Sequence, residues 1–191
     1  MKKNNLIPLI TGIIFLIFGI SAIINGIFII KNPLIIIWFC HIGLIVLGMG
    51  FLIKNKKIID SQINILAIPL IIWAADFLQF LFTGKSILGI SAYFFQQGEL
   101  ISKIITSQHL FTIPLSLYSR RFIKSPSRNS IVLSLIIIAP IFFLSRYFGS
   151  EKNINAVYSL LNISGASYPI LWFMIFIIMV LITNLALNRL D

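Results

Sequence analysis

The sequence predicts an all-α membrane protein, one polytopic bundle of about six transmembrane helices over residues 1–191, with both termini in the cytoplasm. Of the 191 residues, 59% are hydrophobic and only 10% are charged, whereas a soluble domain carries roughly 25% charged residues. The apolar residues form long runs, and a membrane-spanning helix needs about 20 such residues. The basic residues lie in short groups between the runs, which indicates membrane topology and contact with anionic lipid head groups rather than nucleic-acid binding.

Six apolar runs qualify as membrane spans. The first run is too long for the apolar part of a signal peptide, so we expect a retained helix. Between the third and fourth runs, residues 83–99 contain an apolar piece too short to cross, which predicts an interfacial or re-entrant segment. The six predicted spans are residues 6–30, 34–53, 63–82, 100–118, 131–148 and 168–187.

The charges predict the orientation of this bundle. With six spans, ten of the fifteen basic residues fall on one side of the membrane and five on the other. Cytoplasmic loops carry the excess of Lys and Arg, so we expect the richer side to face the cytoplasm, in a prokaryotic cell membrane. The ten residues are Lys2, Lys3, Lys54, Lys56, Lys57, Arg120, Arg121, Lys124, Arg128 and Arg189.

Four reactive or ionisable side chains fall inside the predicted spans: Cys40, His41, Asp76 and His109. Such groups are costly in hydrocarbon, and they mark functional sites more often than chance. Counted from the predicted outer ends at about 1.5 Å per residue, Cys40 lies about 10 Å deep, Asp76 about 9 Å and His109 about 14 Å. We therefore expect these groups to meet in a cavity in the outer half of the membrane.

Polar residues on two spans repeat at the spacing of a single helix face. Such a face is expected to point into the bundle or toward a wet cavity. On the third span the face consists of Trp73, Asp76 and Gln79. On the fourth span it consists of Ser102, Thr106, His109, Thr112 and Ser116.

Two chemistries fit these residues. In the first, Cys40 is a nucleophile and His109 is its base, with Asp76 or Asn155 orienting the histidine, which would support acyl transfer through a thioester. In the second, His41, His109 and Asp76 hold a zinc ion and leave a position open for water. No tight metal motif and no glycine-rich phosphate loop is present, so we predict neither a metal nor another cofactor.

Three segments in a fixed order carry a resemblance: WFCHIGL at 38–44, SQHLFTIP at 107–114 and NINAVY at 153–158. Together they resemble a group of uncharacterised small prokaryotic multi-pass membrane proteins over about residues 34–173. That group is distantly similar to the YwaF-like integral membrane proteins and their eukaryotic phospholipid acyltransferase relatives, and more loosely to membrane threonine hydrolases that act on lipid esters. In the acyltransferase relatives, an early Cys-His pair and a later histidine are the candidate catalytic groups, and they match Cys40, His41 and His109.

The leading expectation is therefore a membrane-embedded lipid acyltransferase or ester hydrolase, with its pocket open to the outer leaflet. We expect membrane lipids as its partners. The alternatives are a non-enzymatic protein that binds or transports a small molecule or lipid, and a structural subunit; a homo-oligomer stays open for either. The residues expected to contact substrate are His41, Trp73, Gln79, Thr106 and Asn155.

Overall fold

The structure is a computed structural model that describes residues 3–96, 99–150, 153–160 and 163–190. Most of these residues are helical, which confirms the predicted all-α class. Two short strands pair antiparallel near the end of the chain. In order, the elements are α1 (Lys3–Ile24), the π turn η1 (Asn25–Ile29), the 3₁₀ turn η2 (Pro33–Ile37), α2 (Phe39–Leu52), α3 (Lys56–Thr83), α4 (Ala92–Gln96), α5 (Leu100–Thr106), α6 (Gln108–Arg120), α7 (Ser130–Phe148), the 3₁₀ turn η3 (Ile154–Ala156), β1 (Ser159–Leu160), β2 (Ile163–Ser164) and α8 (Tyr168–Arg189).

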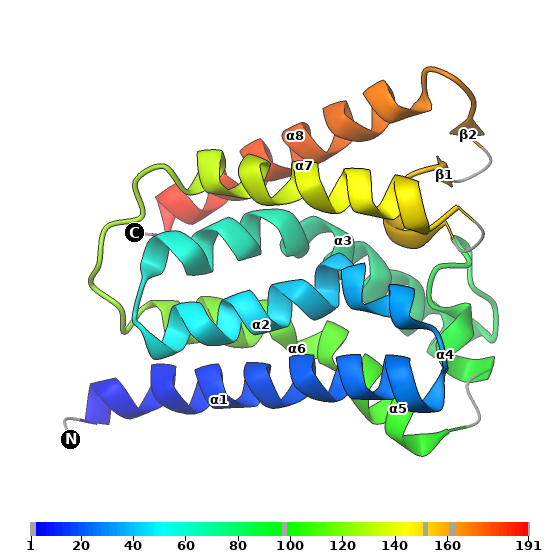
Figure 1. Ribbon diagram of the computed structural model, residues 1–191. Helices are drawn as coiled ribbons and strands as arrows, with labels where there is room; N and C mark the ends of the chain where they lie inside the picture. The colour runs from blue at the N-terminus through cyan, green and yellow to red at the C-terminus, as the bar shows by residue number, and fades with distance from the viewer. Residues whose placement is uncertain (1–2, 97–98, 151–152, 161–162, 191) are drawn as a thin grey trace.

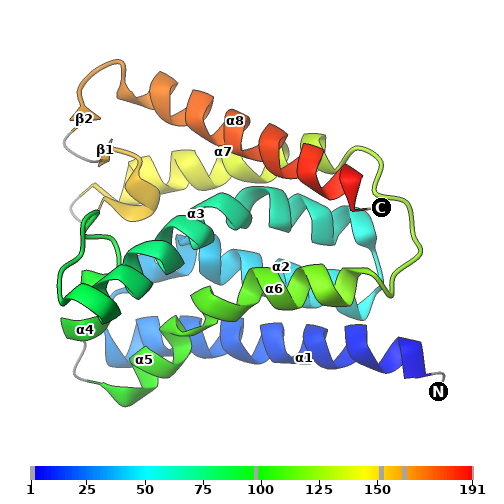
Figure 2. The ribbon, with the colours of Figure 1, turned by 180° about the vertical axis from the view of Figure 1, so that it is seen from behind.

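The long helices lie side by side in one bundle (Figure 1). The start of α1 and the end of α8 lie at the same end of this bundle, as the view from behind also shows (Figure 2). We call this the terminal end. The opposite end, which we call the distal end, holds α4, β1 and β2. Helix α3 runs from the terminal end to the distal end, so its first turn lies at the terminal end and its last turn at the distal end.

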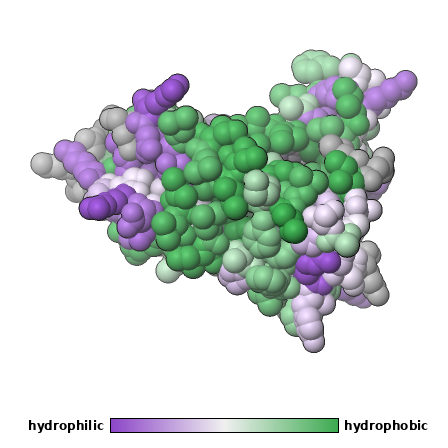
Figure 3. Space-filling view, turned by 90° about the horizontal axis from the view of Figure 1, so that it is seen from above, coloured by the Kyte–Doolittle hydropathy of each residue, from purple (hydrophilic) through white to green (hydrophobic). Residues whose placement is uncertain are grey.

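Four helical segments are long and apolar enough to cross a membrane: Leu6–Ile29, α3, α7 and α8. The surface agrees with this, because the face in Figure 3 is apolar across its middle and hydrophilic at both ends. Large apolar side chains of the long helices are exposed, among them Ile136 at 62% and Ile170 at 70%. Soluble proteins rarely expose such a continuous apolar surface, so this belt is compatible with a protein embedded in lipid.

The predicted second and fourth spans are each broken into two pieces. The second span is divided at Trp38, whose backbone is extended (φ −66°, ψ 133°), so that α2 begins only at Phe39. The fourth span is divided into α5 and α6 at Ser107. There the Leu110 amide donates to the Ser107 carbonyl, one residue later than a regular α-helix requires. Six complete spans therefore remain a prediction.

A buried ion pair joins α3 to α6 near the terminal end. The Arg120 Nε lies 2.5 Å from Asp60 Oδ1, and a second guanidinium nitrogen lies 3.1 Å from Oδ2. Only 3% of the arginine side chain and 1% of the aspartate side chain are exposed. The Ser127 hydroxyl donates to the same carboxylate. Sequence analysis placed Arg120 in a cytoplasmic connection and left Asp60 outside the third span, whereas the fold buries both.

We predict that breaking this ion pair destabilises the bundle more than any exposed charge does. Arg120→Gln should lower the free energy of unfolding by about 3–5 kcal/mol, because it leaves the Asp60 carboxylate buried without its cation. Thermal and denaturant unfolding in detergent micelles measure the change. Arg121→Gln, which removes an exposed arginine next in sequence, is the matched control and should change stability by less than about 0.5 kcal/mol. Equal effects of the two variants would contradict the structural role of the pair.

Candidate functional site

A cavity of about 400 Å³ lies between α2, α3 and α8 in the distal half of the bundle. Most of its wall is apolar and includes Leu66, Leu70, Trp172, Phe176 and Met179. Pockets of this size and character are typical of sites for small or chain-like apolar ligands. The polar groups in the wall are few: Cys40, Trp73, Tyr93, His109, Asn153, Asn155 and Tyr168.

Asn155, from the loop that follows α7, fixes the start of α2. Its Oδ1 accepts a hydrogen bond from the Phe39 amide at 3.0 Å, and its Nδ2 donates to the Ile37 carbonyl at 2.8 Å. The same Nδ2 lies 2.9 Å from the Ser145 hydroxyl on α7. Asn155 therefore caps a helix to which it is not adjacent in sequence, and it satisfies the backbone groups exposed by the break at Trp38.

Cys40 is the second residue of α2, so the Asn155 cap determines where its thiol points. The side chain is buried, and the cysteine is free. It lines the cavity together with His109, and both imidazoles lie within electrostatic reach of its thiol. Cys40 and His109 therefore share one cavity, and His41 follows Cys40 in the sequence.

Each imidazole is held by a backbone carbonyl beside a helix break, and the Ile35 carbonyl also accepts the Trp38 amide. His41 Nδ1 lies 2.9 Å from the Ile35 carbonyl, in the 3₁₀ turn before α2. His109 Nδ1 lies 2.6 Å from the Thr106 carbonyl, at the junction of α5 and α6. The Gln108 side-chain amide nitrogen also lies 3.1 Å from His109 Nδ1. A carbonyl oxygen can only accept, so the two carbonyl contacts favour the tautomer with the proton on Nδ1. The remaining nitrogen, Nε2, is then the one that can accept the proton of the Cys40 thiol.

The two histidines differ in their access to the cavity. His109 lines the wall, whereas His41 does not. The Trp73 indole stacks on the His109 ring, with centroids 4.7 Å apart and planes 28° from parallel. This stacking and the Thr106 contact together leave the His109 ring little freedom to turn.

Trp73 also offers a polar group to the cavity. Its Nε1 is buried and makes no hydrogen bond of normal length within the described part of the chain, although the Tyr93 hydroxyl lies within electrostatic reach. A buried donor without a firm acceptor is uncommon in folded proteins. Beside an apolar cavity, such a donor is well placed to bind a carbonyl oxygen of a ligand.

Sequence analysis expected Asp76 to orient His109, but Asp76 binds the connection after α3 instead. Its carboxylate accepts hydrogen bonds from the Ser86 hydroxyl at 2.8 Å, the Leu88 amide at 2.9 Å, and both the amide and hydroxyl of Ser91. These bonds tie the connection after α3 back onto the distal end of α3. The orienting group for His109 is the Thr106 carbonyl, which no side-chain pattern could indicate.

The segment predicted to be interfacial or re-entrant folds against α3. Its short helix α4 places Phe94 and Phe95 on Phe77 and Phe80, with centroids 5.0 Å apart for Phe77 and Phe94 and 3.9 Å apart for Phe80 and Phe95. Tyr93, from the same helix, closes one side of the cavity. Residues 97–98 lie outside the described residues.

Two predicted substrate contacts remain, Thr106 and Gln79, and neither is part of the cavity wall. Thr106 is buried and acts through its backbone carbonyl, while Gln79 is half-buried and is not part of the cavity wall. The polar face of the fourth span does point inward: Ser102, Thr106, Thr112 and Ser116 are all buried. The inward face was therefore predicted correctly.

The alternative zinc ligands His41, His109 and Asp76 do not converge, and the described residues contain no group of three or more His, Cys, Asp or Glu side chains that could hold a metal ion.

Sequence analysis missed several polar residues that the fold places in the interior. Tyr93 was assigned to a segment too short to span, so its contact with the cavity was not foreseen. Tyr168 donates its hydroxyl to the Ala156 carbonyl at 2.7 Å, and the Trp172 indole donates to the Asn155 carbonyl at 3.0 Å. The four-residue spacing of these two side chains on one helix face is the one signal that could have indicated a shared role.

Comparison of the chain with protein-family models, with curated proteins and with solved structures gives no match. The resemblance to the YwaF-like proteins therefore stays an expectation from the sequence.

We predict that Asp76 stabilises the connection between α3 and α5. Asp76→Ala removes the acceptor for four hydrogen bonds, so residues 84–96 should become accessible to proteases while the bundle stays folded. Limited proteolysis with mass spectrometry of the fragments measures the effect. Gln79→Ala, on the same turn of α3, is the matched control and should leave cleavage unchanged. Unaltered cleavage in Asp76→Ala would contradict this role.

Proposed function

We propose that this protein is a membrane-embedded lipid acyltransferase or lipid-ester hydrolase, with Cys40 as nucleophile and His109 as general base. One observation carries the proposal. Cys40 lies in the wall of an apolar cavity that His109 also lines, its thiol lies within electrostatic reach of two imidazoles, and each imidazole has Nδ1 against a backbone carbonyl. A nucleophile beside an oriented base is the arrangement that covalent acyl transfer requires.

The proposed reaction proceeds through a thioester. Nε2 of His109 takes the thiol proton while Sγ attacks the ester carbonyl carbon, and a C–S bond forms. The bond between the acyl carbon and the leaving alcohol then breaks, and the imidazolium returns the proton to that alcohol. Water or an acceptor hydroxyl next attacks the thioester, His109 accepts its proton, and the Cys40 sulfur leaves as a thiolate that His109 reprotonates.

The surrounding residues support these steps in different ways. His41 interacts with the thiol from outside the cavity, so we assign it a positioning role. The Trp73 Nε1–H is the candidate donor for the oxyanion that forms when sulfur attacks. The apolar wall suits an acyl chain and excludes most water.

The shape of the cavity supports a substrate that enters from the membrane. Ile72 of α3 and Ile175 of α8 both line it, and Ile72 is 36% exposed on the lipid-facing surface. A lipid acyl chain can therefore reach the cavity sideways between α3 and α8. This route does not require passage through the connection that Asp76 holds in place.

Trapping of the acyl-enzyme tests the proposal. The purified protein in nanodiscs is incubated with phospholipids that carry a labelled acyl chain, and intact-mass spectrometry detects one acyl adduct that neutral hydroxylamine removes. Since Cys40 is the single cysteine of the sequence, Cys40→Ser should abolish a hydroxylamine-sensitive adduct. His109→Gln should slow its formation by about 10²–10⁴-fold, the usual contribution of a general base. His41→Gln should slow it less.

Two controls are needed to interpret adduct formation in these variants. Unfolding temperatures of the variants must match that of the parent protein, which separates lost chemistry from lost structure. Arg121→Gln, far from the cavity at the terminal end, should retain full adduct formation. Absence of any adduct on the parent protein across acyl-chain lengths, or an equal rate in His109→Gln, would refute the assignment.

We also propose that the chain crosses a prokaryotic cell membrane six times, with both termini in the cytoplasm. The broken pairs η2–α2 and α5–α6 would each complete one crossing, and ten of fifteen basic residues then face the cytoplasm. The common location of both termini supports an even number of crossings (Figure 1). Alkaline-phosphatase fusions after residues 31 and 85 should be active, and those after residues 56 and 190 inactive; the reverse pattern would invert the topology.

A second candidate function is non-enzymatic binding or transport, and one feature of α6 favours it. A buried polar face continues from His109 through Thr112, Ser116 and Ser119 to Arg120. The Ser116 hydroxyl is fully buried without a hydrogen-bond partner among the described residues. A path for a proton or a small polar ligand would use such a face. Transport that survives Cys40→Ser in proteoliposomes and is lost in Ser116→Val would favour this alternative.

A further inference from the structure

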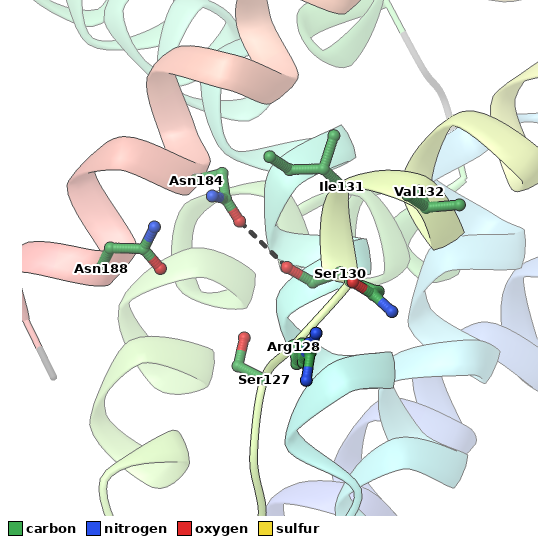
Figure 4. A pocket seen from close by; sticks show the side chains of 8 residues that line it. Ser127, Arg128, Ser130, Ile131, Val132, Asn184 and Asn188 are labelled. Carbon is green, nitrogen blue, oxygen red and sulfur yellow. Dashed lines mark hydrogen bonds between the residues drawn. The ribbon is translucent and has the colours of Figure 1, made fainter.

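A second cavity, of about 410 Å³, opens at the terminal end of the bundle, far from Cys40. It lies between the loop before α7, the first turn of α7 and the last turns of α8 (Figure 4). Six of its lining residues are polar: Ser127, Arg128, Asn129, Ser130, Asn184 and Asn188. Ile131 and Val132 form its apolar side, and Val132 is 54% exposed toward the lipid-facing surface.

A buried network fixes the orientation of Asn184 in this cavity. Its Oδ1 accepts the Ser130 hydroxyl at 2.9 Å, the contact drawn in Figure 4, and the Asn64 amide at 3.4 Å. Asn64 is fully buried and Ser130 is 3% exposed, so this side of Asn184 is held from within the bundle. With its oxygen occupied from two sides, Asn184 presents its amide nitrogen, a donor, on the other side.

The electrostatics of the cavity favour an anion. Among the described residues of its wall, Arg128 is the one that is charged, and the nearby Asp60 carboxylate is neutralised by Arg120 and bound by Ser127. The cavity also faces the first turn of α7, which carries no acidic residue and no side-chain cap. Free amides at the start of a 19-residue helix attract negative charge.

We propose that this cavity binds a phosphate group, presented by the head group of an acidic phospholipid in the leaflet at the terminal end. Arg128 pairs with the phosphate charge, while the Asn184 and Asn188 amides and the first turn of α7 donate hydrogen bonds to its oxygens. Ile131 and Val132 then contact the beginning of the acyl chains. The shared chemistry is phosphate recognition, and a soluble phosphate is the other source that could meet it.

Lipid titration of the delipidated full-length protein in detergent tests this proposal. Native mass spectrometry measures the affinity for phosphatidylglycerol, with zwitterionic phosphatidylcholine as reference. The parent protein should prefer phosphatidylglycerol. Arg128→Gln should weaken that binding by about tenfold or more, because it removes a charge-assisted hydrogen bond. Asn188→Ala, at an exposed position, should weaken it by a smaller factor.

The control variant is Arg121→Gln, which removes an exposed charge at the same end but not in the cavity wall. It should reduce phosphatidylglycerol binding by no more than about fivefold, the contribution of one general surface charge. Competition by millimolar inorganic phosphate would support a phosphate site with a soluble ligand, and its absence would support the lipid. Equal losses in Arg128→Gln and Arg121→Gln, or no preference over phosphatidylcholine, would overturn the proposal.

Discussion

In a bundle surrounded by hydrocarbon, every backbone amide and carbonyl must find its hydrogen-bond partner inside the protein. Unbroken helices meet this constraint by themselves, but the breaks at Trp38 and Ser107 leave backbone groups unpaired. Side chains satisfy them: Asn155 binds the Phe39 amide and the Ile37 carbonyl, and His109 binds the Thr106 carbonyl. His41 binds the Ile35 carbonyl, which also accepts the Trp38 amide. The candidate site consists of the side chains that form these hydrogen bonds and of Cys40 next to them.

This origin explains why the candidate catalytic groups are so well oriented. Each histidine has Nδ1 against a backbone carbonyl, so the contact beside the helix break also favours one tautomer of the ring. Cys40 is placed by the cap that Asn155 provides to α2. The loop that carries Asn155 is itself held by Trp172 and Tyr168 of α8. Stability and the proposed chemistry therefore depend on the same hydrogen bonds.

The two ends of the bundle use their buried charges in different ways. At the distal end, Asp76 accepts hydrogen bonds from neutral groups and fastens a connection next to the cavity. At the terminal end, Asp60 pairs with Arg120 and joins α3 to α6. Neither carboxylate contacts the Cys40 site, which leaves that cavity apolar. An apolar wall beside an oriented thiol is the combination that the proposed acyl transfer uses.

The sequence by itself determined the all-α class, four of the six predicted membrane-crossing helices, and the inward direction of the polar face on the fourth span. These properties follow from periodicity and length, which are local. It also selected Cys40, His41 and His109, because reactive side chains are rare in apolar runs.

Only the tertiary structure decided where the predicted second and fourth spans break, what Asp76 binds, and which group orients His109. It also decided that Asp60 and Arg120 are buried and that Asn184 lines a cavity with its Oδ1 bonded to Ser130 and Asn64. The bonds of Asp76 to Ser86 and of Asn64 to Asn184 join residues 10 and 120 positions apart, whereas the Thr106 carbonyl is only three residues from His109. Backbone carbonyls carry no sequence signature, so the sequence does not show which side chain pairs with them, whether it is near, as for His109 and Thr106, or distant, as for Asn155 and Ile37.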